Sequence, residues 1–302
     1  MGEDTSEMSN VNHSMYAVID IGSNSIRYME QGGGDKKVIT TRLGSGLASS
    51  GRLSQKSMAR SVSVIAALAA NARHAGYYPV AYATSAVRDA SNRDEFLAAV
   101  YAASGVMPDV LSGEREAEYA YRAAAPHGGG LIDVGGASTQ IMSEGFGISY
   151  PIGCVRGKDI ALARTGSADC DDNWSFQREA LTEYIRSIVR VPKLILAKCA
   201  GVGGSITTLA ALKLGLDKFD STRVDGSVLT RDDVENLIGH LHDLGPARRG
   251  NPLLVERHDV ILYGAAILAF AMDSVCAAEI TVSTKDGMEG YFDFIIHERG
   301  EN

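Results

Sequence analysis

Two stretches of this sequence share one design. Residues 16–25 read YAVIDIGSNS, and residues 130–139 read GLIDVGGAST. In both, an apolar run leads to an aspartate (Asp20 or Asp133), and one apolar residue, a glycine and small polar residues follow. This pattern is typical of a buried strand that enters a tight turn and a second strand. Because the design occurs twice, the sequence predicts two related α/β lobes that face each other, with ligands bound in the cleft between them.

The rest of the chain alternates between strand and helix patterns. In the first lobe we expect strands at 16–19, 26–30, 37–42, 79–83 and 109–111, and helices at 54–75, at 92–104 and from 113 onward. In the second lobe we expect strands at 130–134, 139–143, 197–202, 279–283 and 290–296, and helices at 156–164, 174–190, 204–214, 230–243 and 258–273. The predicted division is a disordered tail at 1–14, a first lobe at 15–127 and a second lobe at 128–302, whose last segment can pack back on the first lobe.

The composition excludes several classes of protein. The chain has 302 residues, of which 45% are hydrophobic and 22% charged, so it supports two folded lobes and is not a disordered chain. A formal charge of −8 argues against a nucleic-acid or anionic-membrane partner. The four cysteines form no CxxC pair, which argues against a zinc site, and we expect reduced thiols in a cytoplasmic protein.

The two Asp-x-Gly turns carry groups that bind phosphate. Glycine and serine leave the backbone uncovered, so that consecutive N–H groups can point at an anion. An aspartate at each strand end, Asp20 and Asp133, can hold Mg²⁺ directly or through water. Each turn alone is also compatible with an ordinary hairpin, but the matched pair favours a clamp on one phosphoryl group. The residues predicted to bind phosphate are Gly22, Ser23, Asn24 and Ser25 in the first turn, and Gly135, Gly136, Ala137, Ser138 and Thr139 in the second.

Three further features are ambiguous when read alone. The cluster with Gly203 and Gly204 lies between a strand and a helix, where it fits a phosphate or nucleotide loop and a structural turn equally well. Arg88 follows a strand and suits a phosphate, or a surface ion pair with Asp89. Glu116, in the first turn of a helix, could accept a proton from an attacking water, although a solvated acidic helix face explains it more simply.

The order of these motifs resembles that of one family. The turns at 20–25 and 133–139, together with residues 83–90 (ATSAVRDA), 112–117 (SGEREA) and 201–204 (GVGG), are similar to the exopolyphosphatase/guanosine pentaphosphate phosphatase (Ppx/GppA) family. Residues 256–261 (ERHDVI) and the segment 282–290 also fit. The resemblance covers nearly the whole chain and fits a short form of the family, without its C-terminal helical region.

This resemblance implies a fold and an activity. The fold is the actin-like one, shared with sugar kinases and Hsp70 and related to ribonuclease H, with two lobes and an interlobe cleft. The activity is hydrolysis, dependent on Mg²⁺ or Mn²⁺, of a terminal phosphoanhydride bond in inorganic polyphosphate or of the γ-phosphate of pppGpp. By motif position, Glu116 matches the water-activating glutamate, Arg88 the phosphate-binding arginine and Asp133 a metal-associated aspartate. A homodimer is also expected.

The chain departs from the family at several points. Gln140 stands where the family usually has Glu after the second turn, although the apyrase relatives on this fold also have Gln there. Arg115 lies beside Glu116 in sequence, and we expect this cation to lower the pKa of Glu116. Without the C-terminal region and with a net charge of −8, we expect short polyphosphate chains or a nucleotide as the substrate. Two alternatives are a catalytically weak sensor that binds polyphosphate or (p)ppGpp, which Gln140 motivates, and a small-molecule kinase on the same fold.

Overall fold

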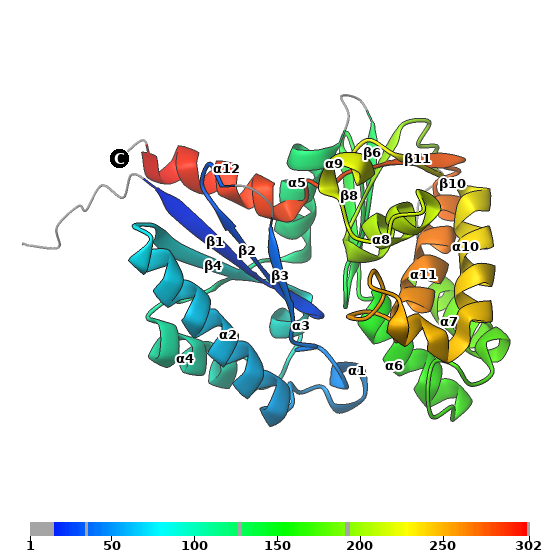
Figure 1. The fold of residues 1–302 in the computed structure, drawn as a ribbon, viewed down its shortest axis with the longest axis horizontal. Coiled ribbons are helices and arrows are strands. Elements are labelled where there is room, and N and C mark those ends of the chain that lie inside the picture. The colour runs from blue at the N-terminus through cyan, green and yellow to red at the C-terminus, as the bar shows by residue number, and fades with distance from the viewer. Residues whose placement is uncertain (1–14, 34–35, 126–128, 191–193, 301–302) are drawn as a thin grey trace, which may run out of the picture.

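The computed structural model describes residues 15–33, 36–125, 129–190 and 194–300, so the tail predicted at 1–14 lies outside the described residues. The chain forms two lobes side by side, and each lobe has a mixed β-sheet with helices packed against it (Figure 1). The prediction of two α/β lobes is therefore confirmed.

The first sheet has the strand order β3-β2-β1-β4-β5. Strand β1 (Tyr16–Ile21) is antiparallel to β2 (Ser25–Glu30), which is antiparallel to β3 (Lys37–Thr40). On its other side β1 is parallel to β4 (Tyr78–Ala83), and β4 is parallel to β5 (Asp109–Val110). Every strand predicted for this lobe is present, with small shifts at the ends.

The second sheet repeats this plan with the order β10-β11-β9-β6-β7-β8. Strands β6, β7 and β8 form an antiparallel meander. Strand β9 is parallel to β6, and β11 is parallel to β9. The repeated turn therefore belongs to a repeated sheet. The pattern did not predict β8 and β10. The strands are β6 (Gly130–Val134), β7 (Thr139–Ser143), β8 (Phe146–Tyr150), β9 (Cys199–Val202), β10 (Val228–Thr230) and β11 (Glu279–Val282).

Two long helices cover one face of the first sheet. Helix α2 (Gln55–His74) begins after Ser54, whose side chain accepts a hydrogen bond from the Ser57 N–H, as expected for an N-cap. Helix α4 (Arg93–Ser104) lies beside it, and apolar residues of both helices pack with those of β1 and β4. The short helices α1 (Leu47–Ser50) and α3 (Ser85–Arg88) were not predicted.

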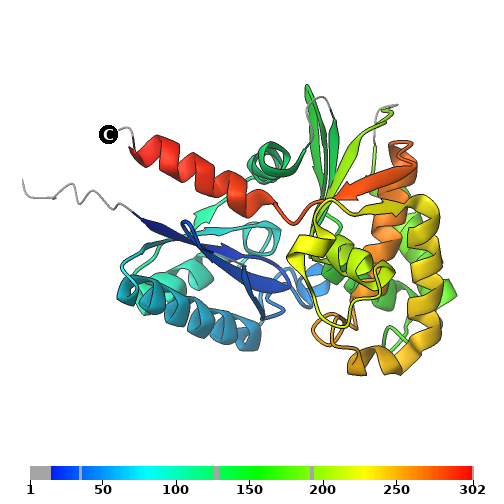
Figure 2. The ribbon, with the colours of Figure 1, turned by 45° about the horizontal axis from the view of Figure 1, so that its top comes forward.

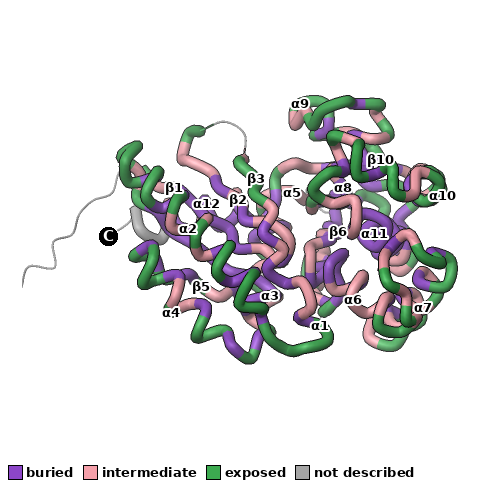
Figure 3. The backbone as a smooth tube through the Cα atoms, turned by 60° about the horizontal axis from the view of Figure 1, so that its bottom comes forward, coloured by how far each residue is buried: buried purple, intermediate pink, exposed green. Residues whose placement is uncertain are grey.

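The second lobe is built around α11 (Ile261–Ser274), which is buried along almost all of its length (Figure 3). The predicted capping box between Thr230 and Asp233 is present at the start of α10. Within the described ranges, none of the helices has the length and hydrophobicity needed to cross a bilayer. The other helices of this lobe are α6 (Cys154–Thr165), α7 (Trp174–Ile188), α8 (Gly204–Lys213), α9 (Ser221–Val224), α10 (Arg231–Leu244) and a 3₁₀ helix (Gly245–Gly250).

Two helices cross between the lobes. Helix α5 (Gly113–Ala124) precedes the second sheet in sequence, yet Ala120 packs against Leu131 and Val202 of that sheet. Helix α12 (Gly287–Gly300) follows the second sheet and runs back along the first lobe (Figure 2). The lobes thus exchange helices, and the predicted boundary between residues 127 and 128 does not separate the two packing units.

The prediction of a strand at 290–296 is wrong, because this segment lies within α12. Its aromatic and β-branched residues favour a strand by local propensity. In the helix, however, Met288, Tyr291, Phe292 and Ile295 lie on one face and pack against Val18, Val80 and Tyr82 of the first sheet. Burial of this apolar face outweighs the local propensity of the segment.

The close contact of α5 with α12 can be tested by substituting two glycines that lie in helices, Gly290 and Gly239. A methyl group at Gly290 would lie 2.6 Å from the carbonyl carbon of Tyr119, whereas one at Gly239 in α10 would meet nothing within 4 Å. We expect Gly290→Ala to lower the free energy of unfolding by about 1–3 kcal/mol through overpacking. Gly239→Ala is the control and should raise it by about 0.5–1 kcal/mol. Urea unfolding of the two variants measures this difference, and equal effects would contradict the tight crossing.

Candidate active site

The two predicted turns meet where the two lobes face each other. A Cβ atom built on Gly136 would lie 2.7 Å from Cβ of Ser23 and 3.2 Å from the backbone nitrogen of Asn24. Each turn closes on itself through the predicted pattern, with Gly22 N–H donating to Ser25 O at 3.2 Å and Gly135 N–H donating to Ser138 O at 3.0 Å. Only glycine allows this approach of the second turn to the first.

The facing turns present free backbone donors. The N–H groups of Ser23, Asn24, Gly136 and Ala137 donate to no other group in the described part of the chain. Converging N–H groups of this kind form an anion site, because their partial positive charges add at one point. The two turns are therefore a candidate site for a phosphoryl group between the lobes.

Arg88 and Glu116 lie in contact, although they belong to different elements. Arg88 ends α3, and its Nη1 donates to Glu116 Oε2 at 3.2 Å and to the carbonyl of Leu111 at 2.8 Å. Glu116 lies in the first turn of α5, where the Ser112 side chain accepts from Arg115 N–H and fixes the helix start. Burial raises the pKa of Glu116 to about 7, and Arg88 offsets part of that rise. Glu116 therefore changes its protonation near neutral pH, which suits a general base.

The prediction that Arg115 lowers the pKa of Glu116 is wrong. The Arg115 guanidinium lies over Phe294 at 5.2 Å and over Tyr119 at 5.6 Å from the ring centroids, and it donates to the Tyr119 hydroxyl at 2.7 Å. Neighbouring residues in a helix point in different directions, so adjacency in sequence does not bring these two charges together. The arginine that acts on Glu116 is Arg88.

The two aspartates of the turns lie on the sheet faces that the crossing helices cover. In β1, Asp20 lies on the same face as Val18, which packs on α12. In β6, Asp133 lies on the same face as Leu131, which packs on α5. Burial raises the pKa of Asp133 to about 7, and the carboxylates of Glu116, Asp286 and Asp20 add to the rise.

Asp20 is held in a network that the sequence did not reveal. Arg27, which pairs with Asp20 across the β1–β2 hairpin, donates from Nε to Asp20 Oδ2 at 2.7 Å and also contacts Asp286. Lys36 joins the network, with its Nζ 3.1 Å from Asp286. Burial raises the pKa of Asp286, but Arg27 and Lys36 outweigh it and bring the pKa to about 2. The register of the hairpin could have predicted that Arg27 lies beside Asp20. Asp286 lies near the other end of the sequence, so the register gave no sign of its contact with Arg27.

The strand ends offer oxygen atoms of the type that a divalent cation binds. Oδ1 of Asp20 and Oε1 of Gln140 are buried and have no hydrogen-bond partner within the described residues. The Gln140 amide nitrogen donates to Ser138 Oγ at 2.9 Å and to Ser149 Oγ at 3.1 Å, which leaves its oxygen free. Carboxylate and amide oxygens are the ligands that Mg²⁺ prefers, and buried carboxylates that raise one another's pKa values favour a nearby cation.

The third glycine cluster borders the same cleft. Gly203, with a φ of 105°, passes close to the end of β6, where an added Cβ would lie 3.1 Å from Oδ1 of Asp133. The guanidinium of Arg257 lies over Gly204, and burial lowers the pKa of Arg257, with Arg27 close enough to add to this effect. No carboxylate or carbonyl in the described part of the chain pairs with that guanidinium. The motif at 256–261 was part of the family resemblance, but the sequence did not predict where the Arg257 side chain lies.

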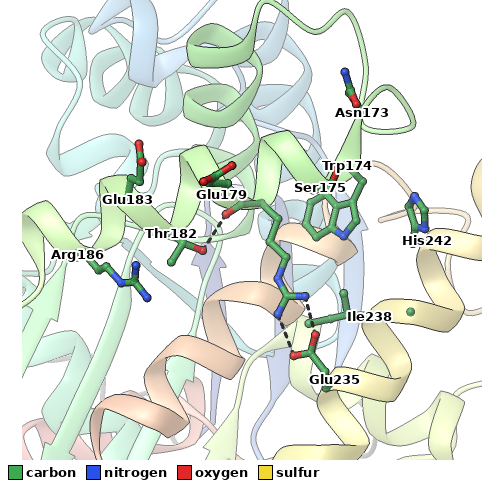
Figure 4. A pocket seen from close by; sticks show the side chains of 12 residues that line it. Asn173, Trp174, Ser175, Glu179, Thr182, Glu183, Arg186, Glu235, Ile238 and His242 are labelled. Carbon is green, nitrogen blue, oxygen red and sulfur yellow. Dashed lines mark hydrogen bonds and ion pairs between the residues drawn. The ribbon is translucent and has the colours of Figure 1, made fainter.

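A hollow elsewhere on the second lobe does not belong to this site. It lies between α7 and α10 and has a volume of about 650 Å³ (Figure 4). Arg178, which lines it, donates to both carboxylate oxygens of Glu235, at 2.6 and 2.8 Å. This hollow contains none of the residues predicted to bind phosphate. The candidate site is therefore the region of the facing turns and not this hollow.

The chain is similar to known proteins over most of its length. The family model described as the Ppx/GppA phosphatase family matches residues 35–298. Exopolyphosphatase 2 of Mycobacterium tuberculosis is 29% identical over 311 aligned positions, which cover 91% of this chain and 96% of the relative. A guanosine-5'-triphosphate,3'-diphosphate pyrophosphatase of Photobacterium profundum is 30% identical over 231 positions, which cover 68% of this chain and 45% of that longer protein.

The fold also has counterparts among solved structures. The crystal structure of an exopolyphosphatase from Cytophaga hutchinsonii superposes with a TM-score of 0.79 at 21% identity, covering 94% of this chain and 98% of that one. This likeness concerns the fold. The two α/β lobes seen here therefore have a counterpart in that solved structure.

The buried carboxylates predict a particular dependence of stability on pH. The pKa of Asp133 in the folded protein, about 7, lies above its value in the unfolded chain, near 3.8. Its contribution to stability is thus greatest at acidic pH and is lost as the pH rises through about 7. We expect Asp133→Asn to raise the free energy of unfolding at pH 8 by on the order of 2 kcal/mol in metal-free buffer, with a smaller gain at pH 5. Urea unfolding at the two pH values measures this.

The control for this measurement is Asp293→Asn, which changes an exposed carboxyl on α12. It should shift stability little at either pH. If Asp133→Asn were no more stable than the parent at pH 8, the raised pKa would be contradicted.

Proposed function

The chain belongs to the Ppx/GppA phosphatase family, and from that premise we propose that it hydrolyses terminal phosphoanhydride bonds and releases phosphate from short-chain polyphosphate or from pppGpp. The observation that carries the proposal is the contact of Arg88 with Glu116 beside two facing turns of free N–H groups. A base, a phosphate-binding cation and an anion site occur together at that point.

In this proposal each group has a distinct task. The N–H groups of the two turns hold the terminal phosphoryl group, and Arg88 offsets the charge that builds up on it. Glu116 accepts the proton of a water molecule whose oxygen attacks the terminal phosphorus. The new bond joins that oxygen to phosphorus, the bond from phosphorus to the bridging oxygen breaks, and the shortened substrate leaves with the bridging oxygen. Arg257 is a second cation for an inner phosphate.

The proposal includes a divalent cation, Mg²⁺ or Mn²⁺. Asp133, Asp20 and Gln140 would hold it, with Oδ1 of Asp20 and Oε1 of Gln140 as the free oxygens. When bound, such an ion neutralises phosphate charge and polarises the phosphoryl oxygens.

The preference for a short substrate follows from charge. With a net charge of −8, the protein repels a polyanion at long range, and attraction must come from the local cations and N–H groups of the cleft. A long polyphosphate would gain few additional contacts. The competing reading, a weakly catalytic sensor, is favoured by one feature, the neutral amide of Gln140 at a position where a carboxylate would bind metal more strongly.

The test is phosphate release from tripolyphosphate, long-chain polyphosphate, pppGpp and ATP in the presence of Mg²⁺ or Mn²⁺. Glu116→Gln should lower kcat by about 10²–10⁴-fold, because it removes the general base without changing the shape of the side chain. The matched control is Glu118→Gln on the same helix, since Glu118 is exposed and, among the described residues, bonds only Arg122 one turn away.

Two outcomes would count against the proposal. Turnover of Glu116→Gln within about threefold of the parent would remove the assigned base, because a general base contributes far more. Undetectable release by the parent, together with micromolar binding of the same compounds, would favour the sensor.

A further inference from the structure

We propose that Arg156 is a positioning residue for the reaction, which acts through Asp89 to keep Arg88 directed at Glu116 and the substrate. The inference rests on the proposed function, since it assigns a further residue to the same site. It starts from one ion pair that crosses between the lobes beside the catalytic arginine.

On the side of the first lobe, Asp89 follows α3 directly and contacts two arginines. Its Oδ1 lies 3.5 Å from Nε of Arg88, and its Oδ2 accepts from Nη2 of Arg156 at 2.6 Å. The Nη1 edge of Arg88 points the other way, to Glu116 and the carbonyl of Leu111. Arg88 therefore lies between two carboxylates, and its direction depends on how strongly each of them holds it.

On the side of the second lobe, Arg156 lies in α6 and is anchored at both ends. Its Nη1 donates to the carbonyl of Pro151 at 3.3 Å, and its side chain is only 12% exposed. Its backbone N–H donates to the carbonyl of Gly136 at 3.1 Å. Gly136 is the residue of the second turn that meets Ser23 of the first turn. A continuous path of contacts therefore leads from the phosphate turns through Arg156 and Asp89 to Arg88.

The ion pair of Arg156 with Asp89 contributes more to the direction of the Arg88 side chain than to holding the lobes together. Asp89 is 34% exposed, and a partly exposed ion pair adds little to stability. The lobes are also joined by the crossing of α5 and α12 and by a second pair, in which Arg42 lies 3.1 Å from Asp259. Loss of Arg156 would therefore leave the lobes together.

What changes without Arg156 is the partner of Asp89. The stronger of its two contacts, at 2.6 Å, disappears, and the carboxylate becomes free to pair fully with Arg88. That pairing draws the guanidinium away from Glu116 and from the phosphoryl group. The effect falls on the transition state, because the charge that Arg88 offsets develops there.

The experiment measures kcat and KM for release of phosphate from the best of the four substrates named above. We expect Arg156→Gln to lower kcat by about tenfold or more with little change in KM, because small displacements of a catalytic group have large effects on rate. Arg156→Lys keeps a cation beside Asp89 and should restore most of the rate. Asp89→Asn combined with Arg156→Gln should be faster than Arg156→Gln alone, since the competing carboxylate is gone.

Two controls separate positioning from other roles. Arg164→Gln removes a cation from the same helix whose guanidinium lies over Tyr184, 5.1 Å from the ring centroid, and should leave kcat unchanged. Asp259→Asn breaks the second interlobe pair, which does not touch Arg88, and should have much less effect on kcat than Arg156→Gln. A single unfolding transition in each variant establishes that it is folded.

Several results would overturn the inference. One is an unchanged kcat in Arg156→Gln, and another is a rise in KM of that variant at constant kcat, which would make Arg156 a direct substrate ligand. The others are a loss of kcat in Asp259→Asn equal to that in Arg156→Gln, and a double variant with a kcat below that of Arg156→Gln. If the parent itself released no phosphate from any substrate, the proposed function would fail, and this inference with it.

Discussion

The crossing of α5 and α12 is the constraint on which the candidate site depends. At this crossing Gly290 lies against the Tyr119 backbone so closely that an added Cβ would be 2.6 Å from its carbonyl carbon. Each of the two helices covers the sheet of the other lobe, so their contact fixes one lobe against the other. The same crossing brings Gly287 to the backbone of Glu116, with 3.7 Å between a built Cβ and the Glu116 carbonyl oxygen. The first turn of α5, and with it Glu116, is therefore placed partly by a contact between backbones, in addition to the cap that Ser112 provides.

Around this crossing the two lobes present equivalent positions with different chemistry. In the first hairpin Asp20 pairs with Arg27, and in the second Asp133 pairs with Gln140. Paired residues of an antiparallel hairpin point to the same face of the sheet, so each aspartate has its partner beside it in the cleft. One lobe places a permanent cation there and the other a neutral amide. The repeat therefore produces an asymmetric site, in which Asp20 is already neutralised by Arg27 and Asp133 is not.

What the sequence predicted correctly was mostly local. The turns at 20–25 and 133–139 follow from glycine and small polar residues at the ends of apolar runs, and the helix starts at Ser54 and Thr230 follow from capping chemistry. The strand predicted at 290–296 and the effect assigned to Arg115 failed for one reason, because tertiary packing on α12 decides both. Asp286 was missed since its partner Arg27 lies on the far side of the sequence. The roles expected of Arg88 and Glu116 came from family resemblance, and their contact was not predicted, because spacing in the sequence does not reveal it.

The balance of charge gives a physical reason for glutamine at position 140. Four carboxyl groups, those of Asp20, Glu116, Asp133 and Asp286, act on one another in the cleft, and their repulsion contributes to the raised pKa of Asp133. A glutamate at 140, opposite Asp133 in the hairpin, would add a fifth and raise that pKa further. Gln140 supplies a free oxygen without this charge, because its amide nitrogen is held by Ser138 and Ser149.

The asymmetry between the two hairpins then has a consequence for binding. On the side of the first lobe, Arg27 and Lys36 balance the carboxylates of Asp20 and Asp286, and they bring the pKa of Asp286 to about 2. A cation is therefore drawn towards the second turn, where no cationic side chain of the described residues pairs with Asp133 and where Gln140 offers a free oxygen.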